Sequence, residues 1–353
     1  MNLDQHDLFA SIDSQNMLGH IDGLPEQLHK AWDLGLQQPL PKWEGIERVL
    51  IAGMGGSAIG ADLLAAYVET KCSVPVLIHR DYNVPAWAAG PQTLVISSSH
   101  SGNTEETLSS FQMAVENGCR CLSITTGGQL AEATQRAQMA LWTFEHNGQP
   151  RAAVGYSFGL LLALFTRLKL IPDPAAELQD AVNAMQEQQE TLQAHIPAIQ
   201  NPAKRMAGQL IGRWVSVFGA GILSPVARRW KGQISEIAKA WAQFEFLPEA
   251  DHNTLAGTLN PEELLSRTTA LFLRCPADHP RNRLRLDITR RTFMLEGIST
   301  DFFDGKGATP LGNQWTALHF GDYTAYYLAM AYGVDPTPVA ALVELKEELQ
   351  NTP

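Results

Sequence analysis

The sequence has few charged residues and no excess of positive charge. Only 18% of its 353 residues are Asp, Glu, Lys or Arg, and 37 acidic residues outnumber 26 basic ones, which gives a net charge of −11. Binding along nucleic acid or an anionic membrane requires clustered Lys and Arg. The composition therefore argues against both as partners, although it does not exclude a small anion site.

Cysteines and long apolar runs are also scarce. The four cysteines form no Cys-x-x-Cys pair, which indicates neither a disulfide framework nor a zinc site, and we expect no metal and no cofactor. The most apolar stretch, residues 158–171, is shorter than the roughly 20 residues that span a bilayer and contains Arg167 and Lys169. The N-terminal residues lack a basic region followed by an apolar one, so we expect no signal peptide and a cytoplasmic location.

The chain is instead rich in short β-forming runs that alternate with helix-length segments. Continuous apolar runs of this kind are typical of parallel strands covered by helices on both faces, so the sequence predicts a doubly wound α/β fold. Residues 214–219 restart the pattern after a glutamine-rich helical stretch, 175–200, whose apolar residues recur at helical spacing. The predicted strands are 48–52, 74–79, 93–99, 119–125, 140–144, 214–219, 269–274 and 300–304.

The same pattern predicts two lobes joined by helices. We expect an N-terminal helical segment at 1–44, a first lobe at 45–153, a helical connector at 154–205, and a second lobe at 206–353 that ends in a helix. The glycine-rich turn that starts at Gly53 parallels the turn at Gly219, each after an apolar run and before a helix. This weak repeat suggests duplication of one unit, with the two loops facing a shared cleft.

The first glycine turn, Gly53-Met-Gly-Gly-Ser57, lies between a predicted strand and a predicted helix. Glycines there let backbone N–H groups approach an anion at a helix start, so the turn fits a dinucleotide or a phosphate site. Tight strand-to-helix turns also use glycine for steric reasons alone. The run lacks the Gly-Lys-Ser/Thr ending of nucleotide triphosphatases.

A second turn is more specific. Residues 99–107, Ser-His-Ser-Gly-Asn-Thr-Glu-Glu-Thr, follow the strand at 93–99 and open a helix that Asn103 or Thr104 would cap. Hydroxyls together with free N–H groups at a helix start form a neutral cradle for one phosphate. An ordinary Ser/Thr-rich cap accounts for one or two hydroxyls but hardly for four.

Together these turns resemble the sugar isomerase (SIS) domain. With the run that starts at Arg151-Ala-Ala, the helix Glu236-Ile-Ala-Lys and the segment Pro248-Glu-Ala-Asp-His252-Asn, nearly the whole chain is similar to the bifunctional phosphoglucose/phosphomannose isomerases. The resemblance implies two SIS lobes in a homodimer and a phosphosugar substrate, glucose 6-phosphate and mannose 6-phosphate giving fructose 6-phosphate.

The resemblance also implies the catalytic residues. Aldose–ketose isomerisation needs an acid/base pair that opens the sugar ring, a base that moves a proton between carbons 2 and 1, and a group that stabilises the enediolate. Glu236 matches the family's base, and Arg151 matches the group that faces the enediolate. His252 and Lys346 match the ring-opening pair, with His252 reaching the neighbouring subunit's site. Thr337 is the hydroxyl that helps to admit both carbon-2 epimers.

Without the resemblance, these residues have ordinary interpretations. Glu236 could be a solvated partner of Lys239, and Lys346 a surface residue of an amphipathic helix.

The phosphate ligands implied by the resemblance are Gly56, Ser57, Ser99, Ser101 and Thr104. His100 stands where the family is expected to have an aromatic residue such as tyrosine, and we interpret it as pointing outward.

Three alternatives remain open at this stage. A sugar-phosphate sensor would keep the cradle and dispense with Glu236 and His252. A dinucleotide enzyme would need an acidic residue about 20 positions after the Gly53 turn, where only Glu69 is near and it precedes the next strand. An isomerase for another six-carbon phosphosugar would share most of the site.

Overall fold

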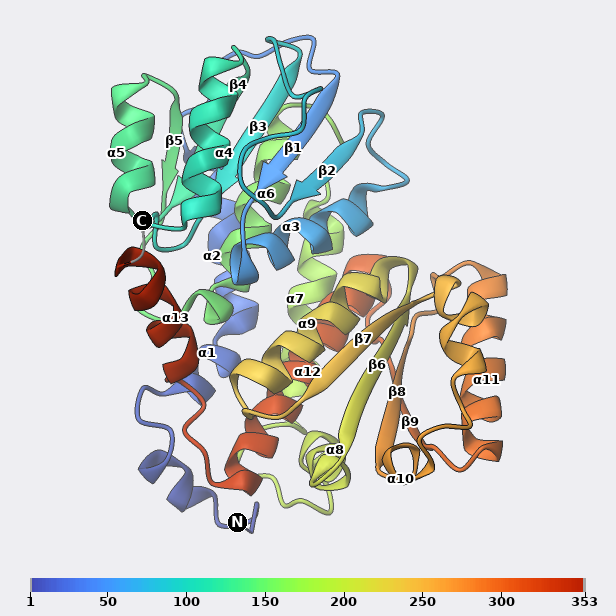
Figure 1. Cartoon of the computed structure of the whole chain (residues 1–353). Coiled ribbons are helices and arrows are strands. Elements are labelled where there is room, and N and C mark those ends of the chain that lie inside the picture. The colour runs from blue at the N-terminus through green and yellow to red at the C-terminus, as the bar shows by residue number, and fades with distance from the viewer. Residues whose placement is uncertain (1, 352–353) are drawn as a thin grey trace.

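The computed structural model describes residues 2–351 and contains two parallel sheets. The five-stranded sheet has the order β2-β1-β3-β4-β5, and the four-stranded sheet has the order β7-β6-β8-β9 (Figure 1). The doubly wound α/β fold expected from the sequence is confirmed. The strands are β1 (Arg48–Ala52), β2 (Val76–His79), β3 (Thr93–Ser98), β4 (Arg120–Thr125), β5 (Ala140–Thr143), β6 (Trp214–Ala220), β7 (Ala242–Leu247), β8 (Thr268–Arg274) and β9 (Ser299–Asp304).

Helices cover both faces of the first sheet because successive strand residues point to opposite sides. Leu50, Val95 and Cys121 pack with α4 (Glu105–Glu116) and α5 (Gly128–Arg136) on one face of the sheet. The apolar residues that alternate with them along the same strands point to the other face and pack with α3 (Gly55–Val68) and α6 (Val154–Arg167). The long helix α2 (Leu24–Gln37) lies on α6. The central strand β3 is buried along its whole length, as a doubly covered parallel strand should be.

The second sheet is covered in the same way. α11 (Pro280–Leu295) packs on one face through Leu286 and Phe293, and α9 (Ser224–Glu236) lies on the other. The sequence analysis missed the edge strand β7. Its residues, Ala-Gln-Phe-Glu-Phe-Leu, alternate polar with apolar side chains and are only partly buried, so they lack the continuous apolar run that marks the inner strands.

A long buried helix joins the two halves. α12 (Pro310–Tyr332) is buried along nearly its whole length and packs against α7 (Ala175–Gln189), α8 (Pro202–Leu210) and α9. One apolar core therefore extends from the first sheet to the second. The helix predicted over 175–200 ends earlier, at Gln189, and turns lead from there to α8. None of the helices within the described residues is both long and apolar enough to cross a membrane.

The remaining elements are short, apart from the C-terminal helix. They are η1 (His6–Ser11), α1 (Met17–Asp22), η2 (Pro150–Ala152), η3 (Gly221–Leu223), η4 (Glu249–His252), η5 (Thr254–Ala256), α10 (Glu262–Leu265) and α13 (Ala340–Asn351). The domain boundaries proposed from the sequence stay a prediction. The helix α6, which the sequence analysis placed in the connector, packs inside the first half against α2 and α3.

The internal repeat has a structural counterpart. Gly55 and Gly221 follow the first strand of their respective sheets and both have φ of +49°, in the left-handed region that favours glycine. The residues before them, Met54 and Ala220, have closely similar extended conformations. The two halves therefore use one type of strand-to-helix turn.

Candidate active site

The predicted phosphate cradle forms where β1 and β3 end. The Ser99 hydroxyl lies 3.0 Å from the Thr104 hydroxyl and accepts a hydrogen bond from the Gly102 N–H at 3.1 Å. The Ser57 hydroxyl accepts from the His100 N–H at 3.2 Å, which links the two loops. The predicted hydroxyls therefore gather at one edge of the sheet, with Ser99 buried and Ser101 exposed at the rim.

Two helix starts face this cradle. α3 begins at Gly55 and α4 begins at Glu105, so both offer backbone N–H groups and the positive end of a helix dipole. Thr104 precedes α4 as expected, but its hydroxyl contacts Ser99 and makes no capping hydrogen bond. The Asn103 side chain accepts from the Gln129 N–H instead. Thr104 thus occupies the N-cap position, but the prediction that its side chain or that of Asn103 caps α4 with a hydrogen bond is wrong. The Thr104 hydroxyl belongs to the predicted cradle instead.

Gly56 connects the cradle to Arg151. A Cβ atom at position 56 would lie 2.5 Å from the carbonyl oxygen of Pro150 and 3.1 Å from the Arg151 nitrogen. Only glycine allows this approach, because any side chain would push the Pro150–Arg151 backbone away from the turn. The glycine requirement at position 56 therefore fixes the start of the arginine-bearing segment against the turn that carries the predicted cradle.

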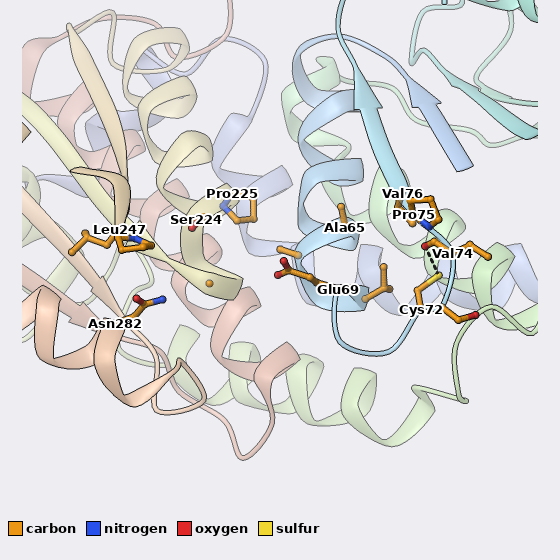
Figure 2. Close-up of a pocket in the computed structure, with 15 residues that line it drawn as sticks. Ala65, Glu69, Cys72, Val74, Pro75, Val76, Ser224, Pro225, Leu247 and Asn282 are labelled. Atoms are coloured by element: carbon orange, nitrogen blue, oxygen red, sulfur yellow. Dashed lines mark hydrogen bonds between the residues drawn. The ribbon is translucent and has the colours of Figure 1, made fainter. Parts of the chain in front are cut away.

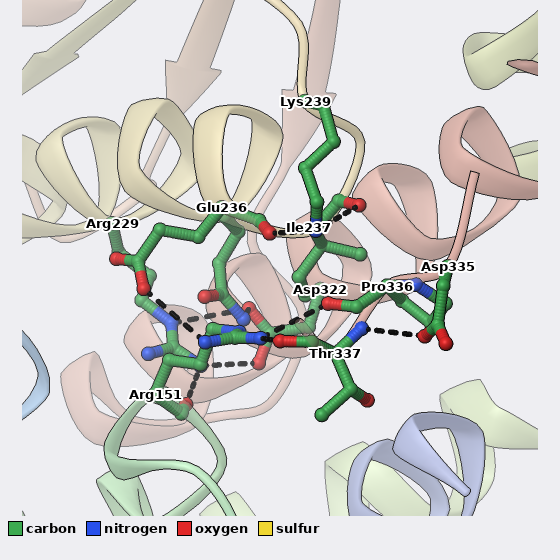
Figure 3. A network of polar contacts seen from close by, with 10 residues as sticks. Arg151, Arg229, Glu236, Ile237, Lys239, Asp322, Asp335, Pro336 and Thr337 are labelled. Atoms are coloured by element: carbon green, nitrogen blue, oxygen red, sulfur yellow. Dashed lines mark hydrogen bonds and ion pairs between the residues drawn. The ribbon is translucent and has the colours of Figure 1, made fainter. Parts of the chain in front are cut away.

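Arg151 and Glu236 form an ion pair beside Thr337 (Figure 3). Arg151 Nη1 lies 3.4 Å from Glu236 Oε2, and the Arg151 side chain is 5% exposed whereas that of Glu236 is 33% exposed. Arg151 Nη2 also donates to the carbonyl oxygens of Pro336, at 3.0 Å, and of Thr337. The Thr337 hydroxyl is buried without a hydrogen-bond partner among the described residues. Three residues predicted from the sequence are therefore brought together.

A buried ion pair supports this arginine, and the sequence analysis missed it. Arg229 and Asp322 are both 4% exposed and are joined by two hydrogen bonds of 3.1 and 2.7 Å, while Gln233 donates to the same carboxylate at 2.9 Å. Arg229 Nη2 donates to the Arg151 carbonyl oxygen at 2.8 Å. The spacing of Arg229, Gln233 and Glu236 on one helix was the available signal, but the partner Asp322 lies in α12, far away in sequence.

Lys239 also lies beside Glu236. The Lys239 ammonium donates to the carbonyl oxygen of Glu236 at 2.6 Å, and the residue has φ of +54° just after α9 ends. Lys239 therefore contacts the backbone of Glu236, whereas an ordinary ion pair between helix neighbours would join it to the Glu236 carboxylate. Burial and the nearby Arg151 lower the pKa of Lys239 to about 8, against the opposing effect of Asp335 and Glu236. The rim of the site thus holds a lysine that loses its charge unusually easily.

His252 and Lys346 lie apart from this group. Glu236 ends α9, whereas His252 lies in η4 beyond the carboxyl end of β7, beside the start of α9. Because α9 has 13 residues and spans about 18 Å, the two residues lie near opposite ends of the helix. Lys346 lies on α13, and both His252 and Lys346 are exposed. Among residues 2–351, no hydrogen bond or ion pair connects either of them to Arg151 or Glu236.

His100 does not point freely into solvent, as the sequence analysis assumed. Its Nε2 atom lies 3.0 Å from Nδ1 of His146, and its ring packs against Phe144. Burial lowers the pKa of both histidines, that of His146 to about 4. The ring at position 100 is therefore a packed, neutral neighbour of the cradle near neutral pH.

The second glycine turn has no corresponding anion site. The Asp278 carboxylate accepts a hydrogen bond from the Ile222 N–H at the start of η3, and it lies where a Cβ atom at Gly221 would be only 2.6 Å away. Burial raises the pKa of Asp278 to about 7. The protein's own carboxyl group thus occupies the place at this turn that corresponds to the cradle of the first half.

The groove next to this second turn contains none of the predicted site residues. It has a volume of about 680 Å³ and lies between the end of α3 and the start of α9 (Figure 2). Its lining includes Glu69, Cys72, Ser224, Leu247 and Asn282. We therefore place the site at the other end of α9, where Arg151 and Glu236 meet.

The fold and the hydroxyl cradle define a class of protein, the SIS-domain phosphosugar isomerases. The family model described as the bacterial phospho-glucose isomerase C-terminal SIS domain matches residues 199–349. The crystal structure of tagatose-6-phosphate ketose/aldose isomerase from Escherichia coli has the same fold, with a TM-score of 0.70 and 16% sequence identity over 92% of this chain and 95% of that one.

Two relatives then identify the family. A bifunctional phosphoglucose/phosphomannose isomerase from Caldicellulosiruptor bescii is 39% identical over 337 residues, which are 94% of this chain and 98% of that protein. Another, from Aquifex aeolicus, is 32% identical over 88% of this chain and 94% of its own length. The chain belongs to the family of bifunctional phosphoglucose/phosphomannose isomerases.

Proposed function

We propose that this protein interconverts glucose 6-phosphate and mannose 6-phosphate with fructose 6-phosphate through a cis-enediol. Family membership supports the reaction, and one observation supports the location of the site. Gly56 lies against Pro150 and Arg151, so the phosphate cradle and the Arg151–Glu236 pair adjoin. A six-carbon sugar phosphate carries its phosphate at one end and its reacting carbons at the other, as this arrangement requires.

The substrate binds by its phosphate. The hydroxyls of Ser57, Ser99, Ser101 and Thr104 donate hydrogen bonds to the phosphate oxygens, and the N–H groups at the starts of α3 and α4 complement its charge. The Gly56 backbone forms part of the same wall. The site thus needs no Lys or Arg for the phosphate, in keeping with the acidic composition.

Ring opening comes first in the aldose direction. One of His252 and Lys346 takes the proton of the anomeric hydroxyl while the other donates a proton to the ring oxygen, which breaks the bond between carbon 1 and that oxygen. Since these residues lie away from Glu236 within one chain, we propose that the protein is a homodimer in which His252 acts in the neighbouring subunit's site. This arrangement would make a monomer inactive.

The carbon-to-carbon proton transfer follows. Glu236 takes the proton from carbon 2 while the carbonyl oxygen on carbon 1 gains negative charge, and the buried Arg151 guanidinium stabilises that charge. The proton of the hydroxyl on carbon 2 passes to the oxygen on carbon 1, and Glu236 returns its own proton to carbon 1. The oxygen on carbon 2 thereby becomes the carbonyl, and no redox cofactor is needed. Rotation about the bond between carbons 2 and 3, beside the Thr337 hydroxyl, lets the same base serve both epimers.

The test is product formation by the purified protein. Glucose 6-phosphate and mannose 6-phosphate are incubated separately with enzyme and chelator, without added cofactor, and fructose 6-phosphate is followed by NMR. Conversion of both supports the proposal. If neither is converted although both bind, a sugar-phosphate sensor becomes the better account, and failure to bind either would reject the substrate class.

A further inference from the structure

The loop between α12 and α13 holds Arg151 through its backbone. Arg151 Nη2 donates hydrogen bonds to the carbonyl oxygens of Pro336, at 3.0 Å, and of Thr337. Pro336 and Thr337 are buried, and Pro338 follows them. Because prolines carry no N–H group, Thr337 provides the single backbone N–H between positions 336 and 338. The orientation of the two carbonyl groups therefore depends on what binds that N–H.

Asp335 binds the Thr337 N–H and so orients the peptide group that contacts Arg151. Its Oδ1 atom accepts a hydrogen bond from this N–H at 2.9 Å (Figure 3). The Thr337 N–H and the Pro336 carbonyl belong to one trans peptide group, in which the N–H and the C=O point in opposite directions. When Asp335 holds the N–H on one side, the carbonyl oxygen therefore faces Arg151 on the other.

The second oxygen of this carboxylate is held by the N-terminal segment. The Ser14 hydroxyl donates to Asp335 Oδ2 at 2.5 Å, across 321 positions of the chain. The preceding residue, Asp13, is buried, and its carboxylate accepts from the N–H groups of Met17 and Leu18 at 2.7 and 2.9 Å, which anchors Ser14 at the start of α1. One oxygen of Asp335 is thus bound by the loop and the other by the N-terminal segment.

Asp335 also contributes negative charge beside the ion pair. Burial lowers the pKa of Arg151, and the carboxylates of Glu236 and Asp335 oppose this effect. Burial and Arg151 lower the pKa of Lys239, and Asp335 is the larger of the two charges that oppose them. The carboxylate therefore lies close enough to both cations to favour their charged forms.

We propose that Asp335 is a positioning residue of the isomerase, which orients Arg151 through the Pro336–Thr337 peptide group and is itself held by Ser14. The inference rests on the proposed function of Arg151 as the group that stabilises the enediolate. Because the negative charge on the sugar develops only in the transition state, a small rotation of the Arg151 guanidinium lowers kcat more than it weakens substrate binding. The N-terminal segment thereby supports catalysis from outside the predicted site.

Steady-state kinetics of two variants at position 335 test this role. Asp335→Ala removes the acceptor of the Thr337 N–H, and we expect kcat to fall about 10- to 100-fold for both sugars while KM changes less than about 3-fold. Asp335→Asn keeps an oxygen that can accept from this N–H, so its kcat should lie within about 5-fold of the wild type. Wild-type kcat in Asp335→Ala, or an Asp335→Asn enzyme as slow as Asp335→Ala, would overturn the proposal.

A double-mutant cycle shows whether Asp335 acts through Arg151. Arg151→Lys keeps the positive charge but lacks the planar fork that bonds two carbonyl oxygens and a carboxylate at once. If Asp335 works by orienting the guanidinium, Asp335→Ala should lower kcat less than about 2-fold in the Arg151→Lys background. An equal fall in both backgrounds would show that Asp335 acts independently of Arg151 and would overturn the proposal.

Ser14→Ala tests the link to the N-terminal segment. Loss of the hydroxyl leaves one oxygen of Asp335 unbound by the chain, and we expect kcat to fall about 2- to 5-fold with KM unchanged. Ser11→Ala is the matched control, because the Ser11 hydroxyl lies in the same segment but donates locally to the Leu8 carbonyl oxygen at 2.6 Å. That variant should keep wild-type kcat. Wild-type kcat in Ser14→Ala would overturn the part that the proposal assigns to the N-terminal segment.

Failure of the proposed function would give a different result from failure of this inference. A wild type that converts neither glucose 6-phosphate nor mannose 6-phosphate would reject the proposed function, and with it a catalytic role for Asp335. A wild type that converts both sugars, with a kcat that Asp335→Ala leaves unchanged, would overturn the inference alone.

Discussion

Substitution of Gly56 by alanine should lower turnover more than it lowers binding or stability. The added Cβ atom would lie 2.5 Å from the Pro150 carbonyl oxygen, roughly 1 Å inside ordinary van der Waals contact. The Pro150–Arg151 backbone must move away by a comparable distance, and the Arg151 guanidinium moves with it. A misplacement of about 1 Å costs on the order of 100-fold in rate when a group must meet developing charge.

The assay separates this effect from general damage. We expect kcat for Gly56→Ala to fall about 100-fold, with KM changed much less. The free energy of unfolding should be about 1–3 kcal/mol lower than that of the wild type, because the added methyl group overpacks the turn. Gly232→Ala in α9 is the matched control, since its Cβ atom would meet nothing within 4 Å. That variant should gain about 0.5–1 kcal/mol of stability and keep wild-type kcat. A Gly56→Ala enzyme with wild-type kcat would refute the claim that this glycine positions Arg151.

Three further substitutions test other parts of the account. Ser99→Ala removes a cradle hydroxyl and should raise KM about 10- to 100-fold in steady-state kinetics with a smaller change in kcat; an unchanged KM would remove Ser99 from the phosphate site. Asp322→Asn leaves Arg229 buried without its charged partner and should cost about 3 kcal/mol in denaturant unfolding and lower kcat; wild-type stability would contradict this. His319 is fully buried, and burial lowers its pKa to about 4, below its ordinary 6.5, so the folded state binds fewer protons between these values. Stability should therefore fall as pH drops from 6.5 to 4, by about 3 kcal/mol at most, and His319→Gln should flatten this profile in unfolding measurements; an unaltered profile would rule His319 out as its cause.

Much of the fold could be predicted because buried parallel strands leave a continuous apolar run in the sequence. β3 and β8 lie within a residue or so of the predicted bounds. β7 could not be recognised in this way, because an edge strand with Gln243 and Glu245 on its open side resembles a partly exposed loop or helix.

The site was predictable where its residues lie in local motifs. The cradle of Ser99 and Thr104 comes from one turn, so spacing alone brings its hydroxyls together. The support of Arg151 by Arg229 and Asp322 depends on contacts across 78 and 93 positions, which no local pattern encodes. The gap between His252 and Glu236 likewise appears only when the strands and helices are placed in space.

The most direct test of the central claim is the reaction of Glu236→Gln with glucose 6-phosphate and mannose 6-phosphate, followed by NMR in heavy water. Wild-type enzyme should form fructose 6-phosphate from both and incorporate solvent deuterium at the transferred position to the extent that the base exchanges with solvent. The variant keeps the shape of the side chain and loses the base, so turnover should fall by several orders of magnitude while phosphosugar binding is largely kept. Turnover in Glu236→Gln close to that of the wild type would contradict the mechanism.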